Sequence, residues 1–240
     1  MNLPTPQIGF DRFIHLDWVA TVMKVRAGTV SLDEMDALLD AAGLGKEAKA
    51  KTRTKLNALG LEPKADVFDF IDRGIRLLNN FETAAQTAVF AWGAATTVYP
   101  YFGRVAEFTG RLTSIQGDCA VSEIHRRMSE VYGDREVTKR ATQAVIQTQA
   151  NWGAIQRVEK GKRLIRLVPM NLVNEKIVEW LVEAALRYHG KPMSISNLQS
   201  TPVIYPFTLD VPLAYVASKS SILELRSEGP SHQLIALRAA

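Results

Sequence analysis

The sequence predicts a mainly α-helical protein with many helices and small β-hairpins. Apolar residues recur at spacings of three and four through the first two thirds of the chain, which is the period of an amphipathic helix. Of the 240 residues, 47% are hydrophobic and 22% are charged, as in a soluble protein with a packed core. Gly and Pro are too few, and lack the fixed period, for a collagen-like or low-complexity chain. A chain of this length has room for one large domain or two to three small modules.

Residues 1–62 are predicted to form a helical region that resembles a helix-turn-helix. An apolar stripe over residues 13–25 predicts the first helix, and Gly28 ends it. Ser31 and Glu34 have the spacing of a capping box at the start of an acidic second helix. Gly43 ends that helix, and a basic helix is expected from about residue 45 to 59.

Residues 63–99 are predicted to hold two central helices. The first spans residues 66–80 with one apolar side. The second lies in a stretch without charge, residues 83–103, which is long enough to cross a bilayer. Most of that stretch is Ala and Thr, which contribute little transfer free energy. We therefore expect no membrane span, but a helix buried on most sides that stops near Pro100.

Residues 100–170 have the order expected of a winged helix-turn-helix domain. Helices are predicted over 101–113, 121–131 and 135–151, with turns at Gly117 and Gly133 between them. A hairpin follows, with strands near 155–158 and 164–167 and Gly161 in its loop. Three helices followed by a basic hairpin can place the third helix in a DNA groove and the hairpin on the backbone.

The third of these helices has the side chains of a DNA-reading helix. With about 100° per residue, Val137, Ala141, Ala144, Val145 and Thr148 share one face, predicted to pack on the domain, and Ile146 points near the outer face. Long polar side chains project from the far side, where Lys and Arg suit phosphate or guanine and Gln suits adenine. The predicted contacts on this helix are Lys139, Arg140, Gln143 and Gln147, and those on the hairpin are Arg157, Lys160, Lys162 and Arg163. The alternative is a solvated hairpin in a module that docks on protein.

A second basic cluster lies on the helix at residues 45–59. Its predicted DNA contacts are Lys49, Lys51, Arg53 and Lys55. The preceding helix carries Asp33, Glu34, Asp36 and Asp40, so the alternative is that these acids neutralise the basic helix.

Residues 171–240 are predicted to begin with a helix over 173–188. Apolar runs at 222–225 and 234–237 flank Gly229 and Pro230, which indicates a second hairpin or a degenerate second winged unit.

Catalytic and cofactor motifs are not found in the sequence. The four histidines are far apart, and the single cysteine, Cys119, permits no disulfide within the chain and no thiolate cluster. We expect no enzyme activity, no cofactor and no bound metal. The N-terminus lacks the pattern of a signal peptide, which favours a cytoplasmic location.

Residues 120–167 resemble the winged helix-turn-helix superfamily through VSEIHRRMSEVYGD, EVTKRATQAVIQTQANWG and RVEKGKRLIRL. The whole layout is also similar to accessory proteins of bacterial phage-defence islands of the BrxA type. This resemblance implies binding to double-stranded DNA without catalysis. The sequence thus predicts a bacterial transcription regulator or a non-catalytic subunit of a DNA-handling complex. The alternative is an interaction subunit that binds protein partners, or a second copy of itself, through its winged modules.

Overall fold

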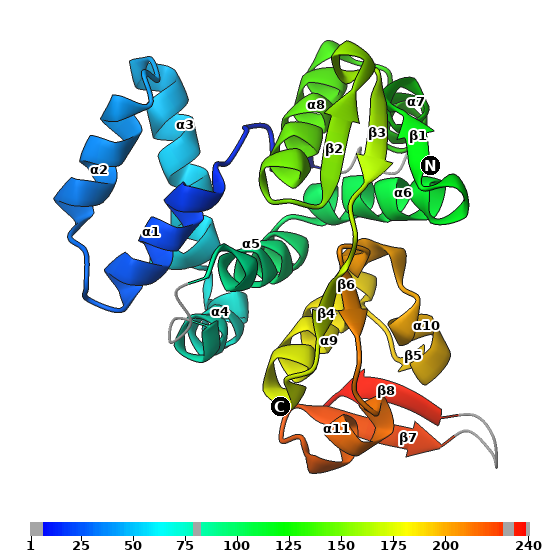
Figure 1. Ribbon diagram of the computed structural model, residues 1–240. Helices are drawn as coiled ribbons and strands as arrows, with labels where there is room; N and C mark the ends of the chain where they lie inside the picture. The colour runs from blue at the N-terminus through cyan, green and yellow to red at the C-terminus, as the bar shows by residue number, and fades with distance from the viewer. Residues whose placement is uncertain (1–6, 79–82, 228–232, 239–240) are drawn as a thin grey trace, which may run out of the picture.

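The computed structural model describes residues 7–78, 83–227 and 233–238, and they form a mainly helical protein with small sheets. Figure 1 shows three parts around two central helices: helices of the N-terminal region, a helix–sheet unit in green and a second such unit in yellow to red. The predicted mainly α-helical class is confirmed.

The N-terminal part contains α1 (Leu16–Arg26), α2 (Leu32–Ala41), α3 (Lys46–Leu56) and α4 (Ala65–Leu78). The predicted capping box starts α2, since the Ser31 side chain accepts from the Glu34 amide and the Glu34 carboxylate accepts from the Ser31 amide at 2.8 Å. A π-helical turn, η1 (Asn57–Leu61), follows α3 and holds Gly60 against Val22. The pattern at 45–59 predicted one continuous helix and did not show this turn.

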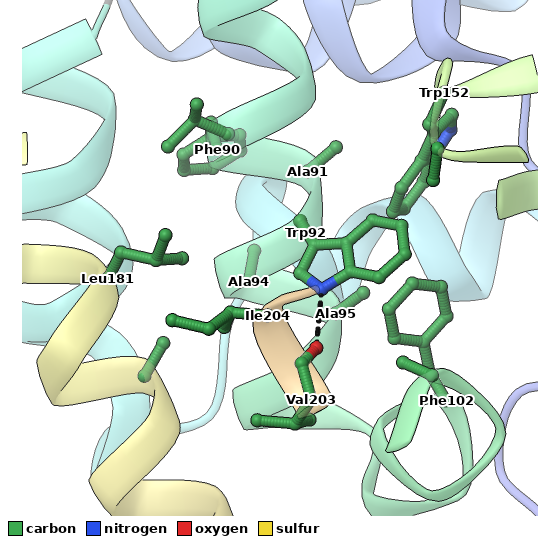
Figure 2. Close-up of a cluster of buried hydrophobic side chains, with 14 of the residues drawn as sticks. Phe90, Ala91, Trp92, Ala94, Ala95, Phe102, Trp152, Leu181, Val203 and Ile204 are labelled. Carbon is green, nitrogen blue, oxygen red and sulfur yellow. Dashed lines mark hydrogen bonds between the residues drawn. The ribbon is translucent and has the colours of Figure 1, made fainter. Parts of the chain in front are cut away.

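The central helices are α5 (Ala84–Val98) and α6 (Pro100–Gln116). The uncharged stretch forms α5, which is buried from Ala88 to Thr96, as predicted. Figure 2 shows Trp92 of α5 beside Phe102 and Trp152, with its indole Nε1 donating to the Val203 carbonyl at 2.8 Å. Among the described residues, no helix combines the length and the apolarity needed to span a membrane.

The first helix–sheet unit, residues 100–166, consists of α6, β1 (Asp118–Ala120), α7 (Val121–Tyr132), α8 (Glu136–Asn151), β2 (Ile155–Val158) and β3 (Arg163–Arg166). Its three strands are antiparallel in the order β1-β3-β2. A short 3-10 turn, η2 (Glu159–Gly161), joins β2 to β3, and Lys160 has a φ of 57° there. The predicted hairpin is confirmed, whereas β1 is too short for its pattern to be read from the sequence.

The second helix–sheet unit, residues 175–237, has a similar order of helices and strands. It contains α9 (Glu175–His189), β5 (Met193–Ser194), α10 (Ile195–Gln199), α11 (Leu213–Lys219), β7 (Leu223–Ser227) and β8 (Gln233–Leu237). Its strands are antiparallel in the order β5-β8-β7, the counterpart of β1-β3-β2. The predicted pairing of the last two strands is confirmed, and Gly229 and Pro230 lie outside the described residues.

The second unit differs from the first by an insertion between α10 and α11. It holds the 3-10 turn η3 (Pro202–Ile204) and β6 (Phe207–Leu209), which pairs in parallel with β4 (Met170–Leu172). Because β4 lies in the link between the two units, this pair ties the link to the insertion.

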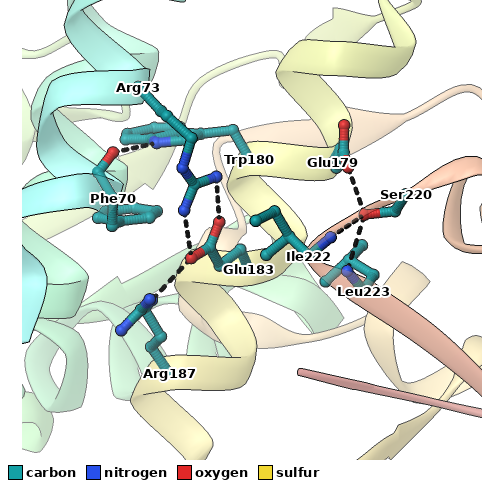
Figure 3. Close-up of polar contacts among 9 residues, drawn as sticks. All are labelled: Phe70, Arg73, Glu179, Trp180, Glu183, Arg187, Ser220, Ile222 and Leu223. Atoms are coloured by element: carbon teal, nitrogen blue, oxygen red, sulfur yellow. Dashed lines mark hydrogen bonds and ion pairs between the residues drawn. The ribbon is translucent and has the colours of Figure 1, made fainter. Parts of the chain in front are cut away.

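Helix α9 packs the second unit against α4 through a buried aromatic pair and a cluster of ion pairs around a buried carboxylate. Trp180 stacks on Phe70 with ring centroids 4.6 Å apart, and its Nε1 donates to the Phe70 carbonyl at 2.9 Å. Figure 3 shows Glu183 between Arg73 and Arg187, and all three of these hydrogen bonds are 2.9 Å long. The Glu183 side chain is fully buried.

Helix α9 also contacts α6 of the first unit. The Tyr188 hydroxyl donates to the buried carboxylate of Glu107 at 2.9 Å, and Arg104 pairs with the same carboxylate at 2.8 Å. Gly103 leaves room for the Tyr188 ring, since an added Cβ would lie 2.4 Å from it. The two units are therefore packed closely together and are not joined by a loose linker.

Candidate nucleic-acid interface

Helix α8 is held in the first unit by the face that carries Thr138, Thr142, Val145, Ile146 and Gln149, all of them buried. The Tyr101 hydroxyl donates to the Thr138 carbonyl at 2.9 Å and lies 2.8 Å from the Thr142 hydroxyl oxygen. The prediction that Ile146 points near the outer face is wrong, because its side chain is fully buried. The packed face is rotated from the predicted one, since buried threonines and a glutamine serve as core residues.

A segment before α1, residues 8–15, covers a second face of α8, and we call it the N-terminal arm. The Ile14 amide donates to the Thr148 hydroxyl at 3.1 Å, and the Trp152 indole donates to the Ile14 carbonyl at 2.9 Å. Phe10 and Ile14 are fully buried and anchor the arm. The arm has no periodic pattern, so the sequence did not reveal that it lies along α8.

The other end of the arm reaches the first turn of α8. Asp11 and Arg12 line a small cavity there together with Glu136, Val137 and Arg140. Val137 is 47% exposed, so its predicted packing on the domain core is wrong: it lies where the arm ends.

The third face of α8 remains open. Its residues advance by about 100° each and fall within about 100° of arc. They are Glu136, Lys139, Arg140, Gln143, Gln147 and Ala150. All four contacts predicted on this helix therefore lie on one face, with Lys139 and Arg140 exposed and Gln143 and Gln147 half-buried.

Both cations on the open face have exposed acidic neighbours. Lys139 lies 3.0 Å from Asp134, and Arg140 lies 2.8 Å from Glu136. Pairs this exposed contribute little free energy, so a phosphate can replace the carboxylate at small cost. Burial lowers the pKa of His125 of α7, and a hydrogen bond to Gln143 acts in the opposite direction.

The hairpin between β2 and β3 carries three cations without an acidic partner. Among the described residues, Arg157, Lys160 and Lys162 form no ion pair. The Arg157 guanidinium lies over the turn, because a Cβ added to Gly161 would be 2.7 Å from its Nη2. Arg163 differs, since it pairs with Asp118, and this hydrogen bond raises the pKa of its guanidinium.

The four predicted contacts on α3 are all ion-paired. Lys49 lies 2.6 Å from Asp40, and Arg53 lies 2.6 Å from Asp36, so α2 pairs with two of the four, in the way the alternative interpretation expected. Lys51 pairs with Glu47 on its own helix, and Lys55 lies 3.2 Å from Asp11 of the N-terminal arm. The arm thus connects α3 with α8.

The positive charge is concentrated in the first helix–sheet unit. Residues 100–166 contain 12 Lys and Arg against 7 Asp and Glu, whereas the rest of the chain contains 17 against 18. This unit therefore carries a net charge of +5 and the rest of the chain −1, which gives the total of +4.

Metal-binding and nucleophilic side chains do not gather in the described residues. Within those ranges, no group of three or more His, Cys, Asp or Glu residues has a geometry that could hold a metal ion. Cys119 is buried, and burial raises the pKa of its thiol to about 11, which disfavours a nucleophilic role. The absence of enzyme activity stays a prediction.

Comparison of the chain with models of protein families, with curated proteins and with solved structures found no match.

Proposed function

We propose that this protein binds double-stranded DNA through the first helix–sheet unit, which we interpret as a winged helix-turn-helix domain. The order α6-β1-α7-α8-β2-β3 and the antiparallel sheet β1-β3-β2 support this interpretation. In this arrangement α8 is the recognition helix and the β2–β3 hairpin is the wing. We interpret the second helix–sheet unit as a modified copy.

The observation that carries the proposal is the combination of an open polar face on α8 with unpaired cations on the hairpin of the same unit. An α-helix fits the major groove of B-form DNA, where Lys139, Arg140, Gln143 and Gln147 meet base edges or phosphates. The three unpaired cations of the hairpin then follow the sugar–phosphate backbone and release counterions. Helix α3 is a weaker contact, because each of its four predicted contact residues must first leave a carboxylate.

The biological role that we propose is that of a bacterial cytoplasmic transcription regulator or a non-catalytic subunit of a DNA-handling complex, such as one in phage defence. The chain supplies binding, and no catalytic step is assigned to it.

The test is a fluorescence anisotropy titration of a labelled random-sequence duplex at several salt concentrations. We expect the triple variant Arg157→Ala, Lys160→Ala, Lys162→Ala to reduce the slope of log K against log salt by about 2.7, at about 0.9 per lost phosphate contact. The variant Lys139→Ala, Arg140→Ala should abolish binding while the fold is kept.

The matched control is the triple variant Lys24→Ala, Lys64→Ala, Lys191→Ala. These cations are exposed, lie outside the first unit and form no ion pair within the described ranges. The control removes the same charge but should keep the wild-type slope. Equal slopes for the two triple variants would contradict the proposal. If the protein binds no duplex but binds a protein partner even at high salt, the interaction subunit would be favoured instead.

A further inference from the structure

A cavity of about 360 Å³ lies between the two helix–sheet units, away from the hairpin turn. The C-terminal half of α6 and the last residue of β3 form one side, and residues 199–207 of the second unit form the other. Its size falls at the lower end of the range of about 300–1,000 Å³ that is typical of small-molecule sites.

Of the residues that the structure describes, two with charged groups line this cavity, Arg111 and Arg166, and none with a carboxylate does. The hydroxyls that line it already have partners: Ser114 donates to the Arg111 carbonyl, Ser200 donates to the Ser196 carbonyl, and Thr201 lies 3.0 Å from His189 Nε2. The two guanidiniums are therefore the groups that select the ligand. A lining with two positive charges and no negative one favours an anion.

Arg166 is held rigidly and still has an unused donor. Its Nη2 donates to the Tyr205 carbonyl at 2.5 Å, and its Cζ lies 5.4 Å from the centroid of the Tyr205 ring. Its Nε has no hydrogen-bond partner but is buried, so a ligand in the cavity would meet the Nη atoms of this guanidinium.

Arg111 supplies the second cation from the α6 side. Its Nη2 pairs with Glu107, and its side chain is 56% exposed, so its other N–H groups remain available. Guanidiniums are suited to oxyanions because their fixed N–H groups match two oxygens at once. Phosphate has more oxygens to share between two such groups than a carboxylate has.

We propose that this cavity is a binding site for a small phosphorylated ligand, whose phosphate lies between Arg111 and Arg166. The cavity also lies close to α8, because the Tyr205 hydroxyl donates to the Gln149 side chain at 2.9 Å. Any effect of the ligand on DNA affinity rests on the proposed function, whereas ligand binding is testable without DNA.

The test is isothermal titration calorimetry of the full chain with inorganic phosphate, against sodium chloride at matched ionic strength. We expect saturable binding at one site and, at phosphate about 100-fold above Kd, a fall of about 100-fold in the unfolding equilibrium constant. Arg166→Gln should abolish binding. Arg111→Gln should weaken it at least tenfold, and its fold should be kept because Glu107 retains Arg104 and Tyr188 as partners.

The matched control is Arg76→Gln, which removes a 70% exposed arginine from α4 and should leave Kd unchanged. If Arg166→Gln does not fold, comparing the phosphate Kd of Arg111→Gln with that of Arg76→Gln still tests the proposal. The proposal is overturned if phosphate binding does not saturate, or if Arg111→Gln binds phosphate as tightly as Arg76→Gln. Failure of DNA binding would leave this result unaffected.

Discussion

The packing around Trp180 predicts that Gly93→Ala destabilises the protein, although alanine is the better helix former. Gly93 lies inside α5, where Gly→Ala alone would stabilise a helix by about 1 kcal/mol. An added Cβ, however, would lie 2.3 Å from Cζ3 and 2.5 Å from Cη2 of Trp180, and ordinary contacts start at 3.4 Å. The indole must therefore move by about 1 Å to accommodate a normal Cβ contact.

Trp180 has little freedom to make that movement. Phe70 stacks on it at 4.6 Å, Phe90 lies 5.9 Å from it, and a Cβ added to Gly74 would lie 2.5 Å from its other edge. Overpacking a close-packed core costs about 1–3 kcal/mol, and a lost indole hydrogen bond costs about 1 kcal/mol more. After subtraction of the helix-propensity gain, we expect a net loss of about 1–3 kcal/mol.

Urea unfolding followed by far-UV circular dichroism measures this loss. The companion variant Gly93→Ala, Trp180→Leu tests the cause, because a smaller side chain leaves room for the methyl group. Its destabilisation should be smaller than the sum of the two single effects by about 1 kcal/mol or more. A Gly93→Ala protein as stable as the wild type, or additive single effects, would refute the reasoning.

Three other properties follow from buried groups. Glu183→Gln should lower the free energy of unfolding by about 2–4 kcal/mol, because the change leaves Arg73 and Arg187 without their carboxylate in a mostly buried site; a loss below about 0.5 kcal/mol in urea unfolding would contradict this. Cys119 should react with an alkylating reagent at mildly basic pH far more slowly in the folded than in the unfolded chain, because burial raises its pKa to about 11 and keeps the thiol protonated; equal rates, measured by mass spectrometry, would argue against it. Burial lowers the pKa of His125 and of His189 below 6.5, so the unfolded chain takes up protons first and stability should fall as the pH falls through about 6.5. The urea midpoint should therefore drop between pH of about 7.5 and 5.5, and the drop should shrink in the variant His125→Gln, His189→Gln.

Features encoded by neighbouring residues could be predicted from the sequence. The capping box of Ser31 and Glu34 and the burial of α5 depend on residues within one or two helical turns. The structure confirms both predictions. The pairing of β2 with β3 and of β7 with β8 is also predictable, because short apolar runs separated by turn-forming residues are local signals.

Features that depend on distant segments could not be read in this way. Ile146 was placed near the outer face because the face of α8 that packs inward also uses threonine and glutamine, whose partners Tyr101 and Tyr205 come from other elements. The N-terminal arm is fixed along α8 by hydrogen bonds to the backbone of Ile14, and backbone groups leave no pattern in the sequence. The hydrogen bond from Arg166 Nη2 to the Tyr205 carbonyl likewise joins residues 39 positions apart.

The arm also explains why partial burial of α8 is compatible with the proposed function. A helix that reads DNA needs only one open face, and α8 divides its circumference among the domain core, the arm and that face. The hydrogen bonds of the arm to Thr148 and to Trp152 fix its course along the helix. Asp11 of the arm pairs with Lys55 of α3, so the arm neutralises one of the cations of the basic helix. If the proposed function holds, ion pairs distributed over three segments limit what α3 adds to DNA affinity. The hairpin, whose three cations have no acidic partner among the described residues, would then supply the main electrostatic contact.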